Sequence, residues 1–153
     1  MQVHWEIYLQ ILKHIEKRLY RRKTRKFTIN VFPRSKKNSS QIIFAKGRRM
    51  IIPSKLYKKF EDECLATIPK KYRKNIDYPV NIKATFYMQS RRRVDLTNLL
   101  EALDDMLVKA EVIKDDCRDI VAGHDYSRVF YDKENPHIDV EITKVENYER
   151  WKE

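Results

Sequence analysis

Glycine is scarce in this sequence, with only Gly47 and Gly123 among 153 residues. The phosphate-cradling loops of nucleotide-binding proteins need several closely spaced glycines. A P-loop and a dinucleotide-binding motif are therefore excluded. Cysteine is equally scarce: Cys64 and Cys117 form no CxxC pair, which excludes a zinc site built on cysteines. No disulfide framework is expected, and this cysteine usage fits a reduced cytosolic compartment best.

Long apolar runs are missing as well. No stretch approaches the roughly 18 consecutive apolar residues of a membrane span, and no secretory signal is recognised. We therefore expect a cytoplasmic protein with no membrane partner. Apolar residues still make up 42% of the chain, which is enough for one sizeable core. The length indicates one domain rather than two.

Charge is unevenly distributed along a chain whose net charge is +11. Residues 1–60 contain 17 Lys and Arg against two acids, whereas residues 95–119 contain eight acids against three bases. Two interpretations are open. Either the acids pair with the bases internally, or the bases hold a polyanion while the acids hold divalent cations on it.

Hydrophobic periodicity predicts a mixed α/β (α+β) fold with packed helices and a mixed sheet. The predicted helices cover residues 3–20, 54–67 and 97–109. The predicted strands cover residues 26–32, 80–88, 117–123, 126–132 and 137–143, and a hairpin joins 41–44 to 49–52 with Gly47 near its tip. We expect an amphipathic N-terminal helix extension over 1–25, one domain over 26–145 and a polar tail over 146–153.

Helix caps and inward-facing residues can also be predicted. Ser54 follows a proline and is expected to cap the second helix, whose inward side chains would be Leu56, Phe60, Cys64 and Leu65. Thr97 is the expected N-cap of the third helix.

Five carboxylates gather around the third predicted helix: Asp95 before it, Glu101 and Asp105 on its polar face, and Asp115 and Asp116 after it. Asp95 lies where a strand gives way to a helix, a junction that holds a side chain between two rigid elements. A chain that turns back beside the first strand would bring Asp116 near Asp95. These five residues are the candidate catalytic set.

Converging carboxylates suit Mg²⁺ or Mn²⁺, and a bound phosphate completes the coordination of either ion. Arg91, Arg92 and Arg93 directly precede the first acid and would grip phosphate. The alternative is that the acids form only a solvated helix face and the arginines a solvated loop. No histidine has a ligand spacing to the acids, so none is expected to be catalytic.

The segment DLTNLLEALDDMLVKAEVIKDD resembles the RusA family of Holliday junction resolvases. That family's pattern is Asp-x-Asp-Asn-x-x-Lys, a helix with Asp-x-Leu, and then a paired Asp-Asp. Asp95, Asn98, Asp105 and Asp116 match it without a gap. FPRSKKNSSQIIF and SRVFYDKENPHIDVEI resemble the family's amino-terminal and closing segments, so the resemblance covers residues 27–144.

The resemblance implies a homodimer that cuts four-way DNA junctions with Mg²⁺, in a family often encoded by phages and prophages. It makes Asp95 and Asp116 metal ligands, with Asp115 an adjacent candidate. The residues expected to contact DNA are Lys36, Lys37, Asn38, Arg91, Arg92, Arg93 and Asn98.

Two positions depart from the family pattern. Thr97 replaces the second Asp, and Glu101 replaces the Lys. Either Glu101 or Asp105 supplies the missing carboxylate in a rebuilt site, which we favour, or the protein is an inactive junction- or RNA-binding protein. A third hypothesis is an adaptor whose first helix binds another protein, although its apolar stripe is expected to pack on this domain or across a dimer. That stripe comprises Trp5, Tyr8, Ile11, Leu12 and Ile15.

Overall fold

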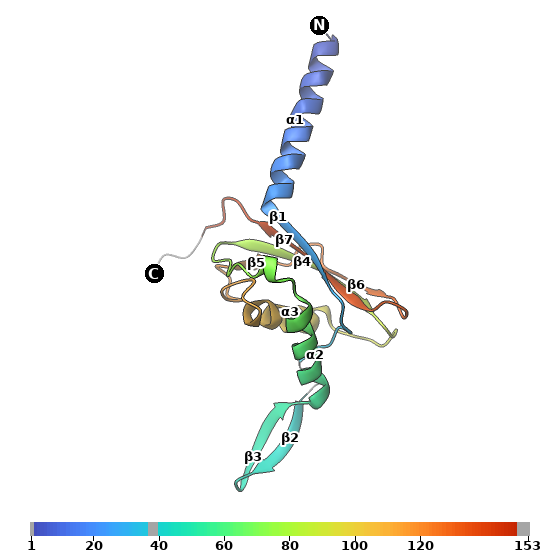
Figure 1. The fold of residues 1–153 in the computed structure, drawn as a ribbon, viewed down its shortest axis with the longest axis vertical. Coiled ribbons are helices and arrows are strands. Elements are labelled where there is room, and N and C mark those ends of the chain that lie inside the picture. Colours follow the sequence, from blue (N-terminus) through green and yellow to red (C-terminus); the bar gives the residue numbers. More distant parts are fainter. Residues whose placement is uncertain (1, 37–39, 150–153) are drawn as a thin grey trace.

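The protein is described from a computed structural model that covers residues 2–36 and 40–149 (Figure 1). Within the first helix, the side chains of residues 5–15 are described. The helices are α1 (Gln2–Lys23), α2 (Lys55–Thr67) and α3 (Leu96–Lys109), with a 3-10 turn at Lys70–Tyr72. The strands are β1 (Thr24–Ile29), β2 (Ser40–Ala45), β3 (Arg48–Pro53), β4 (Val80–Met88), β5 (Val121–Gly123), β6 (Arg128–Tyr131) and β7 (His137–Lys144). The predicted mixed α/β class is confirmed.

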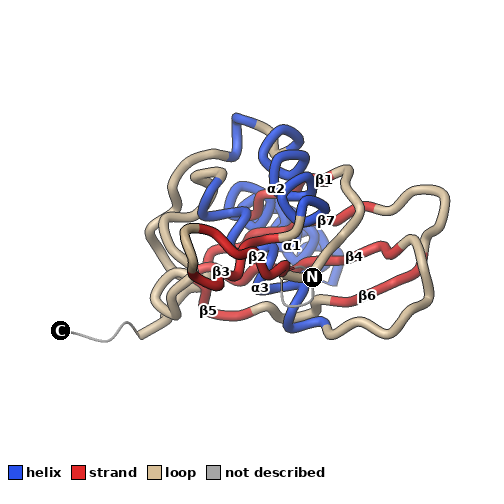
Figure 2. The backbone as a smooth tube through the Cα atoms, turned by 90° about the horizontal axis from the view of Figure 1, so that it is seen from below, coloured by secondary structure: helices blue, strands red, loops and turns tan. Residues whose placement is uncertain are grey.

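The main sheet is built around β4. Its order is β1-β7-β4-β5, with β6 also paired to β4, and Figure 2 shows β1, β7, β4 and β6 side by side. β7 runs antiparallel to both of its neighbours. The other edge of β4 pairs in parallel first with β5 and then with β6. The strand predicted over 117–123 is shorter than expected, because the backbone N–H groups of Ile120 and Val121 bond to the carbonyl of Cys117 in a turn.

A side chain fills the break between β5 and β6. The backbone N–H of Ala84 lies between the two pairings and donates to the hydroxyl of Ser127 at 2.9 Å. Both groups are buried, so without this bond a backbone donor in the core would lack a partner. Ser127 therefore continues the hydrogen-bond ladder of β4 where no strand backbone does.

One face of the sheet is apolar and the other is polar. Along β4 the residues Val80, Ile82, Ala84 and Phe86 are buried and alternate with less buried neighbours. The inward side chains of α2 and α3 join these residues in one core. The opposite face carries charged residues. The protein is therefore a two-layer structure with helices on one face of the sheet.

The start of α2 sets which of its side chains face the core. Ser54 is the N-cap, as predicted, and its hydroxyl accepts a hydrogen bond from the backbone N–H of Tyr57 at 3.2 Å. From this start, Tyr57, Phe60 and Cys64 point inward. The prediction that Leu56 faces inward is wrong, because its side chain is 59% exposed.

The hairpin of β2 and β3 extends from the body at the end away from α1 (Figure 1). Lys46 and Gly47 form its two-residue turn, and both have positive φ angles, of 51° and 72°. Two central residues with positive φ are typical of a type I′ turn, whose twist matches that of the strands it joins. The predicted hairpin with Gly47 at its tip is confirmed.

Helix α1 projects from the start of β1 (Figure 1). Its apolar stripe does not pack on this domain: the large apolar side chains between residues 5 and 15 are all exposed. The expected packing on the domain is therefore wrong, whereas packing across a dimer stays a prediction. Among the described residues, no helix has both the length and the apolar character needed to cross a membrane.

Candidate active site

The loop between β4 and α3 carries the three arginines. Arg91, Arg92 and Arg93 are all exposed. The guanidinium of Arg91 lies over the ring of Tyr131 on β6, 4.5 Å from the ring centroid. A cation over an aromatic face keeps its outer edge open to an anion. The loop thus offers an exposed basic segment directly before the first candidate acid.

Asp95 lies at the start of α3. It is the N-cap of the helix, so the prediction of Thr97 in that position is wrong. The side chain of Asp95 makes no cap hydrogen bond and accepts one from Nδ2 of Asn98 at 3.2 Å. The side chain of Asp95 is therefore exposed and held by Asn98.

Asp105 lies further along α3 and is already paired. Its Oδ2 atom lies 2.8 Å from Nζ of Lys36, in the segment after β1. The hydrogen bond with Asp105 and then its charge raise the pKa of Lys36, and the charges of Glu101 and Glu61 add to this effect. Lys36 therefore lies among three carboxylates from α2 and α3. Lys36, which was predicted to contact DNA, is therefore paired with Asp105 in the structure.

Asp115 and Asp116 follow α3 and are both exposed. Oδ1 of Asp115 accepts a hydrogen bond from the backbone N–H of Asp116 at 2.8 Å. Partial burial, the hydrogen bond with Asp115, and the charges of Asp115 and Asp105 all raise the pKa of Asp116. The charges of Asp115 and Asp105 thus both act on Asp116.

The candidate acids fall into two groups along α3. Asp95 and Asp105 are ten residues apart, and a helix rises 1.5 Å per residue, so about 15 Å of axis separates them. The charge of Asp105 contributes to the raised pKa of Asp116. The predicted approach of Asp116 to Asp95 stays a prediction. Glu101 lies between the two groups, on the exposed face of the helix.

The carboxylates of Asp105, Asp115 and Asp116 are the kind of ligand that a hard divalent cation prefers. They offer only oxygen ligands, and their mutual repulsion is of the kind that a bound cation relieves. Within residues 5–15, 24–36 and 40–149, no three His, Cys, Asp or Glu side chains lie close enough to hold a metal ion. Mg²⁺ commonly binds through one or two carboxylates and takes its other ligands from water and phosphate. Two of these carboxylates, together with water and phosphate, would therefore be enough to bind Mg²⁺.

Asp95, Glu101, Asp115 and Asp116 are exposed, whereas Asp105 is partly buried. A cavity of about 390 Å³ lies elsewhere, on the polar face of the sheet, where it is lined by Lys26, Phe27, Thr28, Lys83, Thr85, Asp139, Val140 and Glu141. Small-molecule sites are usually concave and largely apolar. An exposed acidic group beside basic segments fits a macromolecular substrate better.

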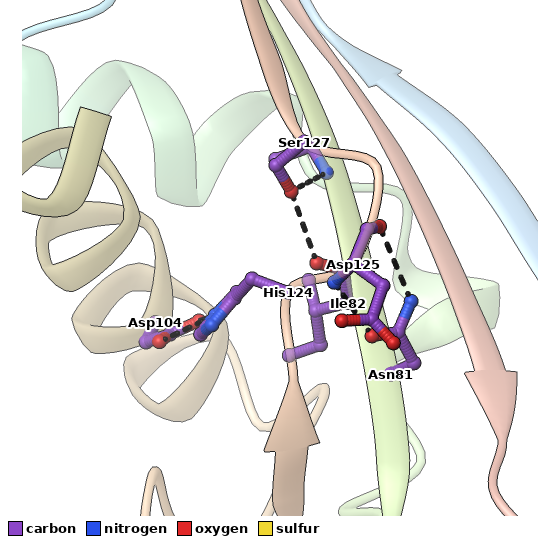
Figure 3. A network of polar contacts seen from close by, with 7 residues as sticks. Asn81, Ile82, Asp104, His124, Asp125 and Ser127 are labelled. Atoms are coloured by element: carbon purple, nitrogen blue, oxygen red, sulfur yellow. Dashed lines mark hydrogen bonds and ion pairs between the residues drawn. The ribbon is translucent and has the colours of Figure 1, made fainter.

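A buried polar contact beside the acids was missed from the sequence. Nε2 of His124 lies 2.9 Å from Oδ2 and 3.1 Å from Oδ1 of Asp104 (Figure 3). Burial raises the pKa of Asp104, while the hydrogen bond and charge of His124 oppose that rise. A charged residue directly after the core residue Leu103 needs a partner, and this was the available signal.

The same network holds the turn that carries His124. The backbone N–H of Asp125 donates to Oδ1 of Asn81 on β4 at 2.8 Å, and Ser127 follows two residues later (Figure 3). The turn is thereby attached to β4 on one side and to α3 on the other. Asp104 and Asp105 are adjacent, so the network also fixes the position of the candidate acid.

Of the residues predicted to contact DNA, Lys37 and Asn38 lie outside the described part of the chain. Lys36, the three arginines and Asn98 are described. The arginines lie in the loop before α3 and Asn98 in its first turn, whereas Lys36 pairs with Asp105 in the second half of the helix.

Comparison with known proteins gives a family match. Residues 30–143 match the family described as Endodeoxyribonuclease RusA. The matched range begins directly after β1, includes α2, α3 and all five candidate acids, and leaves out α1 and β1. Among curated proteins, none matches the chain.

Proposed function

The chain belongs to the RusA endodeoxyribonuclease family, and from that premise we propose that it resolves four-way DNA junctions by metal-dependent hydrolysis of phosphodiester bonds. The observation that carries this proposal is the family match, whose range includes all five candidate acids, among them Asp115 and Asp116, where Oδ1 of Asp115 accepts a hydrogen bond from the backbone N–H of Asp116. Lys36, an exposed basic residue, pairs with Asp105, and the three exposed arginines precede Asp95.

Two of the carboxylates would hold the Mg²⁺ or Mn²⁺ ion. The family resemblance assigns Asp95 and Asp116, with Asp115 adjacent, and the electrostatic contacts favour Asp105 as a partner of Asp116. When bound, the ion would neutralise developing charge and lower the pKa of the attacking water. The arginines of the β4–α3 loop would hold the DNA backbone. Contacts to phosphate position a duplex without reading its sequence, so junction shape would dominate recognition.

A second candidate function has specific support. Thr97 is a poor metal ligand at a position where the family has an aspartate, and Asp105 is occupied by Lys36. Both observations favour a catalytically inactive junction- or RNA-binding protein. Such a protein would bind tightly and lose affinity with added salt, but would need no metal.

Cleavage of an end-labelled four-way junction, with a linear duplex of the same sequence alongside, tests the proposal. The reaction is run in Mg²⁺ and then in Mn²⁺. Symmetric nicks in the junction alone are the expected result. Tight junction binding without cutting in either metal would overturn the nuclease function and support the inactive binding protein. The homodimeric state and a phage or prophage source stay predictions; sedimentation analysis of the free protein measures the first.

A further inference from the structure

The β2–β3 hairpin exposes an apolar face that nothing in the described chain covers. Opposed residues of an antiparallel pair share a face, and so do alternate residues along a strand. Ile42 faces Ile51 across the hairpin, and Phe44 faces Arg49. All four side chains therefore lie on one face, where Phe44 is 79% exposed, Ile51 70% and Ile42 51%.

A two-stranded sheet gains little from standing alone in water. Isolated hairpins are marginally stable, and clustered exposed apolar side chains commonly mark a binding surface. The type I′ turn nevertheless gives this hairpin a defined shape. The hairpin is therefore a projecting arm whose exposed apolar face is available to a binding partner.

The charge of the arm indicates the class of that partner. Residues 40–53 contain Lys46, Arg48 and Arg49 and no acidic residue. Arg49 lies directly opposite Phe44, so a guanidinium and an aromatic ring occupy the same exposed end. Aromatic rings stack on nucleic-acid bases, and basic side chains beside them contact the phosphates. A polyanion with accessible bases matches both features.

The base of the arm lies at the edge of the candidate active site. Lys36, which binds Asp105, precedes the first residue of β2 by four positions. At the other end, β3 leads through Ser54 into α2, whose Glu61 acts electrostatically on Lys36. DNA held at the acidic residues would therefore run past the arm.

We propose that the β2–β3 hairpin is a DNA-binding arm that contacts unstacked bases at a junction branch point, with Phe44 stacking on a base and Arg49 contacting the adjoining phosphate. Ile42 and Ile51 cover the edge of the opened stack, as apolar wedges do in proteins that open base steps. This inference rests on the proposed function and adds a binding site to it.

The test uses a four-way junction that carries 2-aminopurine at the branch point, and a linear duplex with 2-aminopurine in the same sequence. Both are titrated with the full chain without divalent metal, so that no cutting occurs. Phe44→Ala is expected to weaken junction binding about tenfold and to remove the fluorescence change at the branch point. Affinity for the duplex should change less than about twofold, because its bases stay stacked. Tyr126→Ala, at an exposed aromatic on the turn after β5, is the matched control and should leave both unchanged.

Each other outcome overturns the proposal in a distinguishable way. If the wild-type chain binds and cuts junctions while Phe44→Ala matches it in affinity and fluorescence, the arm proposal alone fails. If Phe44→Ala changes the sedimenting mass of the DNA-free protein, the exposed face binds a second copy instead of DNA. If the wild-type chain binds no junction, the proposed function fails and the arm proposal fails with it.

Discussion

Nε2 of His124 lies 2.9 Å from Oδ2 of Asp104, and this contact joins the turn after β5 to the buried side of α3. Asp104 is within the core, whereas its neighbour Asp105 reaches the surface and binds Lys36. The contact therefore ties the turn after β5 to the helical turn from which both aspartates project.

Removal of this contact should destabilise the fold. His124→Ala leaves the Asp104 carboxylate buried without its partner, and the expected loss in the free energy of unfolding is about 2 kcal/mol. Urea denaturation of His124→Ala, Asp104→Asn and the double variant measures the coupling between the two side chains. His14→Ala, at an exposed site on α1, is the control. Additive losses in the double variant would contradict a direct interaction.

The stability should also depend on pH through Asp104. Its folded pKa lies above the ordinary value of 3.8, with burial as the largest cause. As the pH rises above 3.8, the unfolded carboxyl ionises first, so this group's contribution to stability falls until the folded carboxyl has ionised too. Asp104→Asn lacks this titration and should gain stability relative to wild type across that range. A constant difference at every pH would show that Asp104 titrates normally.

Ser127 should matter for the sheet more than its size suggests. Ser127→Ala leaves the buried N–H of Ala84 without an acceptor, at an expected cost of about 2 kcal/mol. Ser90→Ala, at an exposed position after β4, should change the stability by less than about 0.5 kcal/mol. Thermal or urea unfolding of the two variants measures the difference. Equal stabilities would mean that water satisfies the N–H group.

Substitution of the acidic residues should lower the rate of junction cleavage without lowering the affinity for the junction. Asp116→Asn and Asp95→Asn are each expected to lower the junction cleavage rate by about a hundredfold or more, while junction affinity is kept. Asp62→Asn, at an exposed acid on α2, is the matched control and should cut normally. Cleavage at the wild-type rate in both site variants would rule out these residues as metal ligands.

Lys36 should affect metal binding. Lys36→Gln removes a positive charge from among Glu61, Glu101 and Asp105, so Mn²⁺ is expected to bind several-fold more tightly in calorimetric titration. The side chain of Lys36 is 52% exposed, so water screens its pair with Asp105 and stability should fall by less than about 1 kcal/mol. If Lys36 contacts DNA as well, the salt dependence of junction binding should decrease by about one phosphate contact. If the affinity for Mn²⁺ is unchanged, Asp105 is not part of the metal site.

Features that depend on local periodicity were predictable from the sequence. Alternation along β4, the cap at Ser54 and the turn at Gly47 each need only a few neighbouring residues, and each matches the structure. The start of α3 was misplaced because Thr97 and Asp95 are both good capping residues, and the sequence does not rank them.

Features that depend on tertiary contacts were not predictable in the same way. His124 lies 20 positions from Asp104 in sequence, and only the crossover from α3 to β5 brings them together. The pairing of Lys36 with Asp105 spans 69 positions and depends on α3 packing beside the segment after β1. Local periodicity cannot supply either contact, so the sequence identified the acids without their partners.

The pairing of the first strand with the last has a consequence for synthesis on the ribosome. Within the described part of the chain, β1 forms its sheet contacts with β7 alone, and Thr24 meets Thr143 across 119 positions of sequence. Until β7 has left the exit tunnel, β1 has no neighbour and β4 lacks the partner on one of its edges. The sheet therefore closes only near the end of translation, and the nascent chain must keep two unpaired strand edges from aggregating until then.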